Sequence, residues 1–382
     1  MQKATREQIK EHNRRLVLKT VYDHSDMSRA DVARATRLTR TTVSDIVTEL
    51  INTGLLEEVG IGSSAGGKPP ILLGVVDDAR QLVCVDLSDD YFQGALVNLR
   101  GKIAHRNGMS IDCQEDQDTL ACIFEIIDEL LEAATAPLIG IGIGSPGLID
   151  SQAGIVREAV NLGWKDLPLK KVLSERYHLP IYIANDSHVA ALAEFTFGEL
   201  RGTPNLAVLK VGRGIGSGIL LNGQIFYGDG FSAGEIGHLR VVENGVQCRC
   251  GNYGCLETVS STRAILMSLQ KDTYLQPISL DTAFDAYRSG DERAQDILQR
   301  AGLYLGIAIA DLVSILNINN IVLSGNLAGF GTNFLELVHR KVKNRVLAKM
   351  ADETRLSYSA LGQDNVILGA SALVLSKELG LI

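Results

Sequence analysis

The stretch Gly234-Glu-Ile-Gly-His238 is followed, after a spacer of nine residues, by Cys248-Arg-Cys250-Gly-Asn-Tyr-Gly-Cys255-Leu-Glu257. One imidazole and three thiols thus fall within eighteen residues. Three thiolates and an imidazole are a donor set that tetrahedral zinc takes in proteins. The alternative is that these are separate core residues, but packing alone does not explain the short C-x-C-x4-C spacing. We therefore predict a structural zinc site with the ligands His238, Cys248, Cys250 and Cys255.

Two carboxylates, Glu235 and Glu257, bracket this cluster. A zinc ion that already has four ligands in a closed structural site leaves no position for them. We expect both carboxylates to face something other than the metal.

The length and composition indicate a soluble protein of two or three domains. The chain has 382 residues, of which 46% are hydrophobic and 21% charged. Its N-terminus is polar and no run of eighteen apolar residues occurs, so we expect no signal peptide and no membrane partner. Of the six cysteines, three belong to the cluster, which does not suit a secreted disulfide framework. The cytoplasm is the expected location.

The charge is distributed unevenly along the chain. The formal net charge is −8, yet residues 1–44 hold ten Lys and Arg against five Asp and Glu. A basic end on an acidic body indicates that only the N-terminal segment approaches a polyanion.

Residues 1–62 carry the pattern of a winged helix-turn-helix domain. Apolar positions at helical spacing predict a first helix over residues 5–22, and Ser28-Arg-Ala-Asp31 predicts a capping box that opens a second. Thr39 is expected to cap a third helix, and residues 55–59 to form one strand of a wing. The alternative is a three-helix module that binds another protein.

The start of the third helix is rich in small polar and cationic side chains, as in a helix that enters the major groove. The residues expected to contact double-stranded operator DNA there are Arg40, Thr41, Thr42 and Ser44. Residues 63–72 are expected to be a linker. Its cationic part around Lys68 either lies along a phosphate backbone or minor groove, or is a linker only.

The rest of the chain alternates apolar strand-like runs with helical segments, which predicts an α/β fold. Three of these runs end in polar or glycine-rich turns, at Ser145-Pro-Gly147, at Asn185-Asp186 and at Gly212-Arg-Gly-Ile-Gly-Ser-Gly218. Functional residues gather at the carboxyl ends of such strands. Similar strand, turn and hairpin openings near Val85 and Val211 predict two related halves with a cleft between them.

These residues resemble the ROK group of sugar kinases and repressors, in particular its helix-turn-helix regulators of the NagC and XylR type. The resemblance covers essentially the whole chain. Its most specific parts are Glu235-Ile-Gly-His238, the C-x-C-G-x-x-G-C-x-E run that ends at Glu257, Asn185-Asp186, and Gly144-x-Pro146-Gly147 with Asn161-Leu-x-Trp164.

The resemblance implies a two-lobed, actin-like (ribonuclease H-like) sugar-kinase fold. The first α/β lobe is expected over residues 73–190, and the second, with the zinc loop, over residues 191–382; the last helix is expected to pack back on the first lobe. The resemblance also implies a sugar in the cleft, in contact with Asn161, Asn185, Asp186, Glu235, His238 and Glu257. His238 is expected to bind zinc through one nitrogen and to offer the other N–H to a sugar hydroxyl.

Two turns depart from the pattern of the kinases in this family. Those enzymes carry Asp-x-Gly-Gly-Thr at the first phosphate-binding turn, whereas this chain has Asp86-Leu-Ser-Asp89-Asp90. Negative charge there repels a triphosphate. In the second turn Arg213 replaces the usual Thr. Phosphoryl transfer depends on positioning the nucleotide, so we expect no ATP and no kinase activity, with Asp186, the family's base position, left as a hydroxyl acceptor.

The sequence therefore predicts a sugar-responsive DNA-binding transcriptional regulator, a repressor rather than an enzyme, that acts as a homodimer or homotetramer. One alternative is an active sugar kinase with an appended DNA-binding segment. Another is a regulator that senses a protein partner. The effector is a sugar or a sugar phosphate: Arg213 either binds the phosphate of a sugar phosphate or neutralises Asp89 or Asp90 across the cleft.

Overall fold

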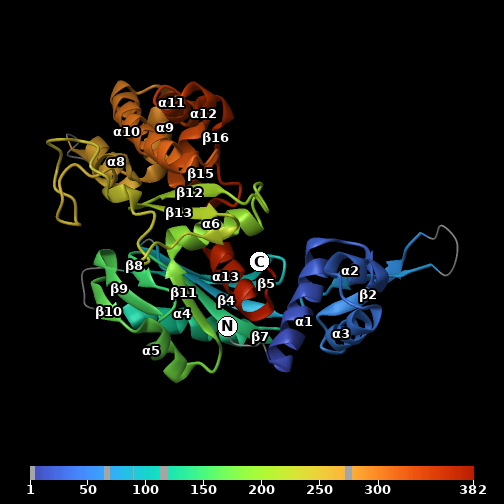
Figure 1. Ribbon diagram of the computed structural model, residues 1–382. Helices are drawn as coiled ribbons and strands as arrows, with labels where there is room; N and C mark the ends of the chain where they lie inside the picture. The colour runs from blue at the N-terminus through green and yellow to red at the C-terminus, as the bar shows by residue number, and fades with distance from the viewer. Residues whose placement is uncertain (1–4, 64–68, 89, 112–118, 272–277) are drawn as a thin grey trace.

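The computed structural model describes residues 5–63, 69–88, 90–111, 119–271 and 278–382. Two α/β lobes lie one above the other, and a smaller N-terminal domain lies beside the first lobe (Figure 1). Lys68 and Asp89 lie outside the described residues, so their proposed roles stay predictions.

The N-terminal domain is a winged helix-turn-helix, which confirms the predicted fold. Its elements are α1 (Arg6–Asp23), β1 (Met27–Ser28), α2 (Arg29–Thr36), α3 (Arg40–Asn52), β2 (Leu56–Ile61) and β3 (Ile71–Val75). The predicted capping box is present, because Ser28 Oγ accepts from Asp31 N at 3.3 Å and Ser28 N donates to Asp31 Oδ2 at 3.0 Å. Thr39 Oγ1 accepts from Thr42 N at 3.2 Å and so begins α3 as expected.

The second strand of the wing lies partly where the sequence predicted a linker. β3 begins at Ile71, within residues 63–72, and pairs antiparallel with β2 from Ile61↔Ile71 to Leu56↔Val75. Leu73 is fully buried in β3, because the apolar run that follows the two prolines covers the core of the helices. The other predicted domain boundaries stay predictions.

The two lobes contain sheets of the same topology, which confirms the prediction of two related halves. The strands of the first lobe are β4 (Gln81–Asp86), β5 (Tyr91–Asn98), β6 (Ile103–Ser110), β7 (Leu138–Ser145) and β11 (Ile181–Asn185), in the order β11-β7-β4-β5-β6. Those of the second lobe are β12 (Leu206–Val211), β13 (Ile215–Leu221), β14 (Gln224–Ile225), β15 (Asn320–Gly325) and β16 (Arg355–Tyr358), in the order β14-β13-β12-β15-β16. In each sheet an antiparallel hairpin is extended by parallel strands.

Smaller elements complete the lobes. A three-stranded sheet of β8 (Leu148–Asp150), β9 (Ile155–Ala159) and β10 (Trp164–Leu167), with η1 (Val160–Leu162), belongs to the first lobe, as do α4 (Thr119–Ala133) and α5 (Leu169–Arg176). The second lobe contains η2 (Ile236–His238), α7 (Glu257–Ser260), α8 (Thr262–Gln270), α9 (Leu280–Ser289), α10 (Glu292–Leu316), η3 (Asn326–Phe330), α11 (Gly331–Lys343) and α12 (Ala348–Glu353).

Two helices, α6 (Asp186–Thr196) and α13 (Asn365–Leu379), cross between the lobes, and η4 (Gly362–Asp364) precedes the second (Figure 1). They pack so closely that a Cβ on Gly369 would lie 1.8 Å from the carbonyl oxygen of Val189. Farther along, α13 packs on the first-lobe sheet and on α1, so one hydrophobic core joins the N-terminal domain, the first lobe and the last helix. A continuous core thus runs from the helix-turn-helix domain to the last helix, which crosses between the lobes.

Among the described residues, α10 alone has the length and apolar composition of a membrane span, and 61% of its apolar window is buried. The helix packs in the hydrophobic core of the second lobe. Such burial is typical of a core helix.

Candidate functional site

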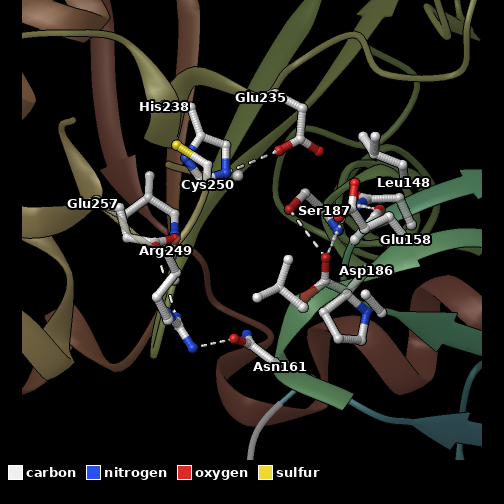
Figure 2. Close-up of a pocket in the computed structure, with 18 of the residues that line it drawn as sticks. Leu148, Glu158, Asn161, Asp186, Ser187, Glu235, His238, Arg249, Cys250 and Glu257 are labelled. Atoms are coloured by element: carbon white, nitrogen blue, oxygen red, sulfur yellow. Dashed lines mark hydrogen bonds and ion pairs between the residues drawn. The ribbon is translucent and has the colours of Figure 1, made fainter. Parts of the chain in front are cut away.

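A cavity of about 470 Å³ lies between the lobes, and residues of both lobes line it (Figure 2). All six residues that match sugar-contacting positions line this one cavity, namely Asn161, Asn185, Asp186, Glu235, His238 and Glu257. Residues at the carboxyl end of β11 and residues of the loop that carries the cysteines border the cavity. A cavity of this size with convergent polar groups is typical of a small-molecule site.

Asn185 and Asp186 place two different groups on the first-lobe side of the cavity. Asn185 Oδ1 accepts from the backbone N of Ser187 at 2.9 Å and caps α6, and its Nδ2 donates to Gly147 O at 2.9 Å. The side-chain amide of Asn185 therefore connects the turn at Gly147 with the start of α6. The carboxylate of Asp186 accepts from Ser187 N at 2.8 Å, and its other oxygen lies 3.1 Å from Lys210 Nζ of the second lobe.

On the second-lobe side, glycines allow the carboxylates to approach the cavity. Gly234 has φ +93°, and a Cβ there would lie 1.9 Å from the carbonyl oxygen of Ser217, so the backbone just before Glu235 packs directly against β13. Glu257 Oε2 accepts from Ile215 N at 3.2 Å, which ties the glycine-rich turn to the carboxylate.

Burial, together with the nearby charges of Asp186 and Glu257, raises the pKa of Glu235 to about 7. The protonated form of this carboxyl group donates to a ligand hydroxyl, and the ionised form accepts from one.

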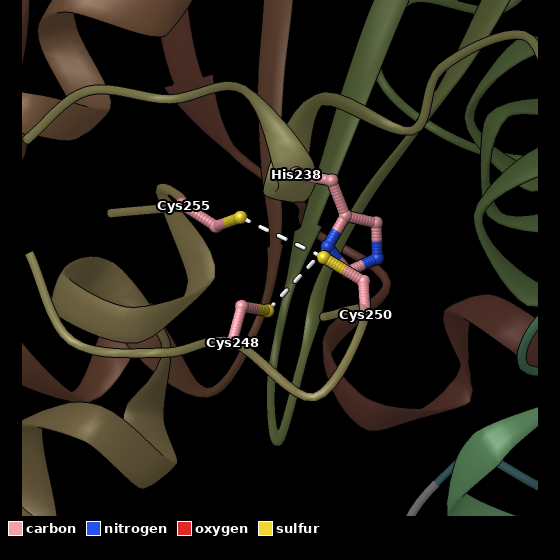
Figure 3. Close-up of side chains that lie close together, drawn as sticks. All are labelled: His238, Cys248, Cys250 and Cys255. Carbon is pink, nitrogen blue, oxygen red and sulfur yellow. Dashed lines mark hydrogen bonds between the residues drawn. The ribbon is translucent and has the colours of Figure 1, made fainter. Parts of the chain in front are cut away.

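The four predicted metal ligands gather beside the cavity (Figure 3). His238 Nδ1 lies 3.7 Å from Cys248 Sγ, Cys250 Sγ lies 3.7 Å from Cys255 Sγ, and all four donor atoms lie within 4.8 Å of one another. Zinc–sulfur bonds of about 2.3 Å in a tetrahedron give sulfur–sulfur separations of roughly 3.8 Å. The cluster thus has the donor set and the spacing to hold a metal ion.

The two nitrogens of His238 face different partners. Nδ1 faces the thiols, whereas Nε2 lies 3.8 Å from Glu235 Oε2 on the cavity side. The expectation that one nitrogen binds zinc and the other faces a sugar hydroxyl stays a prediction.

Sequence reasoning missed two cationic residues of the cavity, Lys210 and Arg249. Arg249 donates to Asn161 Oδ1 of the first lobe and lies 3.5 Å from Glu257 Oε1 (Figure 2). The position of Arg249 between Cys248 and Cys250 could have indicated that it lies near the cavity. Lys210 was also marked in the sequence, because it is the charged residue of an otherwise apolar strand.

Arg213 forms an ion pair with Asp90 of the first lobe. This contact agrees with the interpretation that Arg213 neutralises an acidic residue across the cleft.

The predicted DNA-contacting residues lie at the start of α3. Arg40, Thr41 and Ser44 are exposed, whereas Thr42 is half-buried and its hydroxyl lies 2.9 Å from that of Thr39. The exposed side chains at this turn are free of the core that Val43 and Val47 form on the opposite face.

Comparison with known proteins agrees with the fold. A model of the ROK family matches residues 82–377, and one described as winged helix-turn-helix DNA-binding matches residues 10–57. A xylose repressor of Caldicellulosiruptor bescii is 32% identical over 97% of each chain. A glucokinase of Halalkalibacterium halodurans is 32% identical over 78% of this chain and 96% of its own.

Among solved structures, a ROK family transcriptional regulator, described as a homologue of the Escherichia coli MLC protein, superposes with a TM-score of 0.84 at 28% identity, over 98% of each chain. The regulators thus match nearly the whole chain, whereas the glucokinase matches 78% of it. The chain is a member of the ROK family, with a winged helix-turn-helix domain in front of the family's two-lobed body.

Proposed function

We propose that this protein is a transcriptional repressor whose affinity for operator DNA is set by a sugar bound between the lobes. The observation that carries the proposal is that one hydrophobic core joins the helix-turn-helix domain to the lobe and the helix that border the cavity. A change in the angle between the lobes therefore moves the DNA-binding domain. In a homodimer or homotetramer this movement changes the spacing of two recognition helices, which must match two half-sites.

The effector is a sugar because the cavity presents carboxylates and an amide to vicinal hydroxyls. Asp186, Glu235, His238 and Glu257 contact it, and Asn161 closes over it from η1. The name of the repressor relative makes D-xylose the first sugar to test. The glucokinase relative makes D-glucose the second.

The metal is a structural zinc ion held by His238, Cys248, Cys250 and Cys255. When bound, it crosslinks the loop that carries Glu235 and Glu257 at its two ends. The loop residues then bind and orient the sugar, and His238 turns its Nε2 toward the cavity.

The protein acts in the cytoplasm on double-stranded DNA and does not phosphorylate its effector. Arg40, Thr41 and Ser44 contact the operator from α3, with Thr42 beside them at the helix start, and Lys68 contacts the DNA backbone. Support for the missing kinase activity comes from the Arg213–Asp90 pair at the two turns that would approach a nucleotide.

A thermal-shift screen and calorimetry with D-xylose, D-glucose and their phosphates test the sugar site. A ligand of the folded state raises its apparent stability. We expect one free sugar to raise the melting temperature of the wild type and to leave the Glu235→Gln, Glu257→Gln double variant unchanged. Binding that is equal in the wild type and the double variant would place the sugar elsewhere.

A further inference from the structure

Lys210 of β12 reaches from the second lobe into the first. Its Nζ lies 3.1 Å from Asp186 Oδ2, and the two side chains are only 13% and 11% exposed. The pair therefore joins the lobes in a largely water-excluded place, where the attraction of opposite charges is stronger than at the surface. It differs in this from Arg213 and Asp90, whose aspartate side chain is 59% exposed.

A second buried carboxylate faces the same lysine. Asp86 ends β4, and β7 lies between β4 and β11, whose end leads into Asp186. The carboxylate of Asp86 is 9% exposed and accepts from Ser88 N at 2.9 Å. Burial raises the pKa of Asp86 to about 6, and the charge of Lys210 opposes this rise. One ammonium group of the second lobe thus offsets two carboxylates of the first.

The pair lies at the floor of the cavity, next to the helices that cross between the lobes. Asp186 is the first residue of α6, and β13 of the second lobe runs directly over this turn. A Cβ on Gly218 would lie only 2.1 Å from the carbonyl oxygen of Ser187. Removal of Lys210 would leave the carboxylate of Asp186 buried without its opposite charge. The lysine thus compensates this buried carboxylate at the place where the lobes meet.

We propose that Lys210 is a positioning residue of the cavity: its ammonium group ties the two lobes together at the cavity floor and fixes the Asp186 carboxylate for a hydroxyl of the effector. The second half of this statement rests on the proposed sugar-binding function, whereas the tie between the lobes does not. The positive charge that holds the two lobes together at this place is then the ammonium group of Lys210.

Small-angle X-ray scattering of the sugar-free protein tests the tie. We expect a larger radius of gyration for Lys210→Met, the wild-type value for Lys210→Arg, and the wild-type value for Lys349→Met, a control at an exposed lysine of α12 in the same lobe. If Lys210→Met does not fold, Lys210→Gln replaces it, because a neutral amide keeps a hydrogen-bond donor but not the charge. If the neutral variant has the radius of gyration of the wild type, Lys210 does not tie the lobes together. This conclusion holds whether or not a sugar binds.

Calorimetry with D-xylose and D-glucose tests the positioning of Asp186. For the sugar that binds the wild type, we expect at least tenfold weaker binding by Lys210→Met, recovery by Lys210→Arg and no change in Lys349→Met. Equal affinity of Lys210→Met and wild type overturns the positioning role. If neither sugar binds the wild type, the proposed effector fails, and the scattering still decides the tie.

Discussion

Arg213 of the second lobe forms an ion pair with Asp90 of the first lobe, across the gap between the two turns that in the family's kinases approach the nucleotide. The two side chains are engaged with each other and Asp90 is acidic, an arrangement that disfavours a triphosphate between these turns. We expect no sugar-dependent ATP hydrolysis in a coupled assay with D-xylose or D-glucose, in the wild type or in Arg213→Thr. Sugar-dependent turnover above the no-sugar control would show that the chain is an active kinase.

Replacement of Arg40 and Thr42 by Ala is expected to weaken operator binding. A side chain that contacts a base typically contributes about 1–3 kcal/mol, so the double variant should bind at least tenfold more weakly. The backbone cap of α3 stays, since Thr39 Oγ1 still accepts from the backbone N of residue 42, and only the contact between the Thr39 and Thr42 hydroxyls is lost. Fluorescence anisotropy measures the change on a DNA fragment selected by the wild type from a random-sequence pool.

The control for this experiment is Arg345→Ala, which removes an exposed arginine of the second lobe. It should bind the fragment as the wild type does. Equal DNA affinity of the Arg40 and Thr42 double variant would exclude the start of α3 as the DNA-reading surface.

Replacement of Cys255 by Ser is expected to release the metal and to loosen the loop between Glu235 and Glu257. Cys255 is fully buried, and its Sγ lies 3.7 Å from that of Cys250. We expect lower zinc content by mass spectrometry, a lower melting temperature and loss of sugar binding. Cys122→Ser in α4, outside the cluster, serves as the matched control. If the sugar affinity is unchanged after complete removal of the metal, the metal is not required for sugar binding.

The pH dependence of stability should differ between the wild type and Asp86→Asn. Burial raises the pKa of Asp86 from 3.8 to about 6 in the folded state, so between these values the folded protein binds more protons than the unfolded chain. Stability therefore falls as this carboxyl ionises with rising pH. The Asn side chain cannot ionise, so the variant should gain stability relative to the wild type from about pH 4 to pH 6, by on the order of 3 kcal/mol.

Urea unfolding at a series of pH values measures this difference. Asp311→Asn, at an exposed aspartate of α10, should follow the wild type at every pH. A difference between Asp86→Asn and wild type that does not change with pH would mean that Asp86 does not ionise in this range in the folded protein.

Much of the site could be predicted because its residues stand in short local patterns. The spacing of Cys248, Cys250 and Cys255 predicted a cluster that the structure brings together, and the caps at Ser28 and Thr39 act within three residues. Local patterns of this kind depend on few other parts of the chain.

The remaining features depend on contacts between distant segments. Lys210 contacts Asp186 only because two related sheets face each other, and Arg249 reaches Asn161 only because the loop that carries the cysteines lies near η1. Likewise, β3 follows two prolines and becomes a strand through its pairing with β2. The residues in these contacts are far apart in the sequence, so no local sequence pattern predicts them.

The response of DNA affinity to sugar tests the central claim most directly. We expect D-xylose to change the Kd of the wild type for its selected DNA fragment at least about fivefold, the lower end of typical coupling between two sites. The Asp186→Asn variant should bind the same fragment with a Kd that does not respond to the sugar. A wild-type Kd that is identical with and without D-xylose and D-glucose, or an Asp186→Asn variant that responds as the wild type does, would contradict the account.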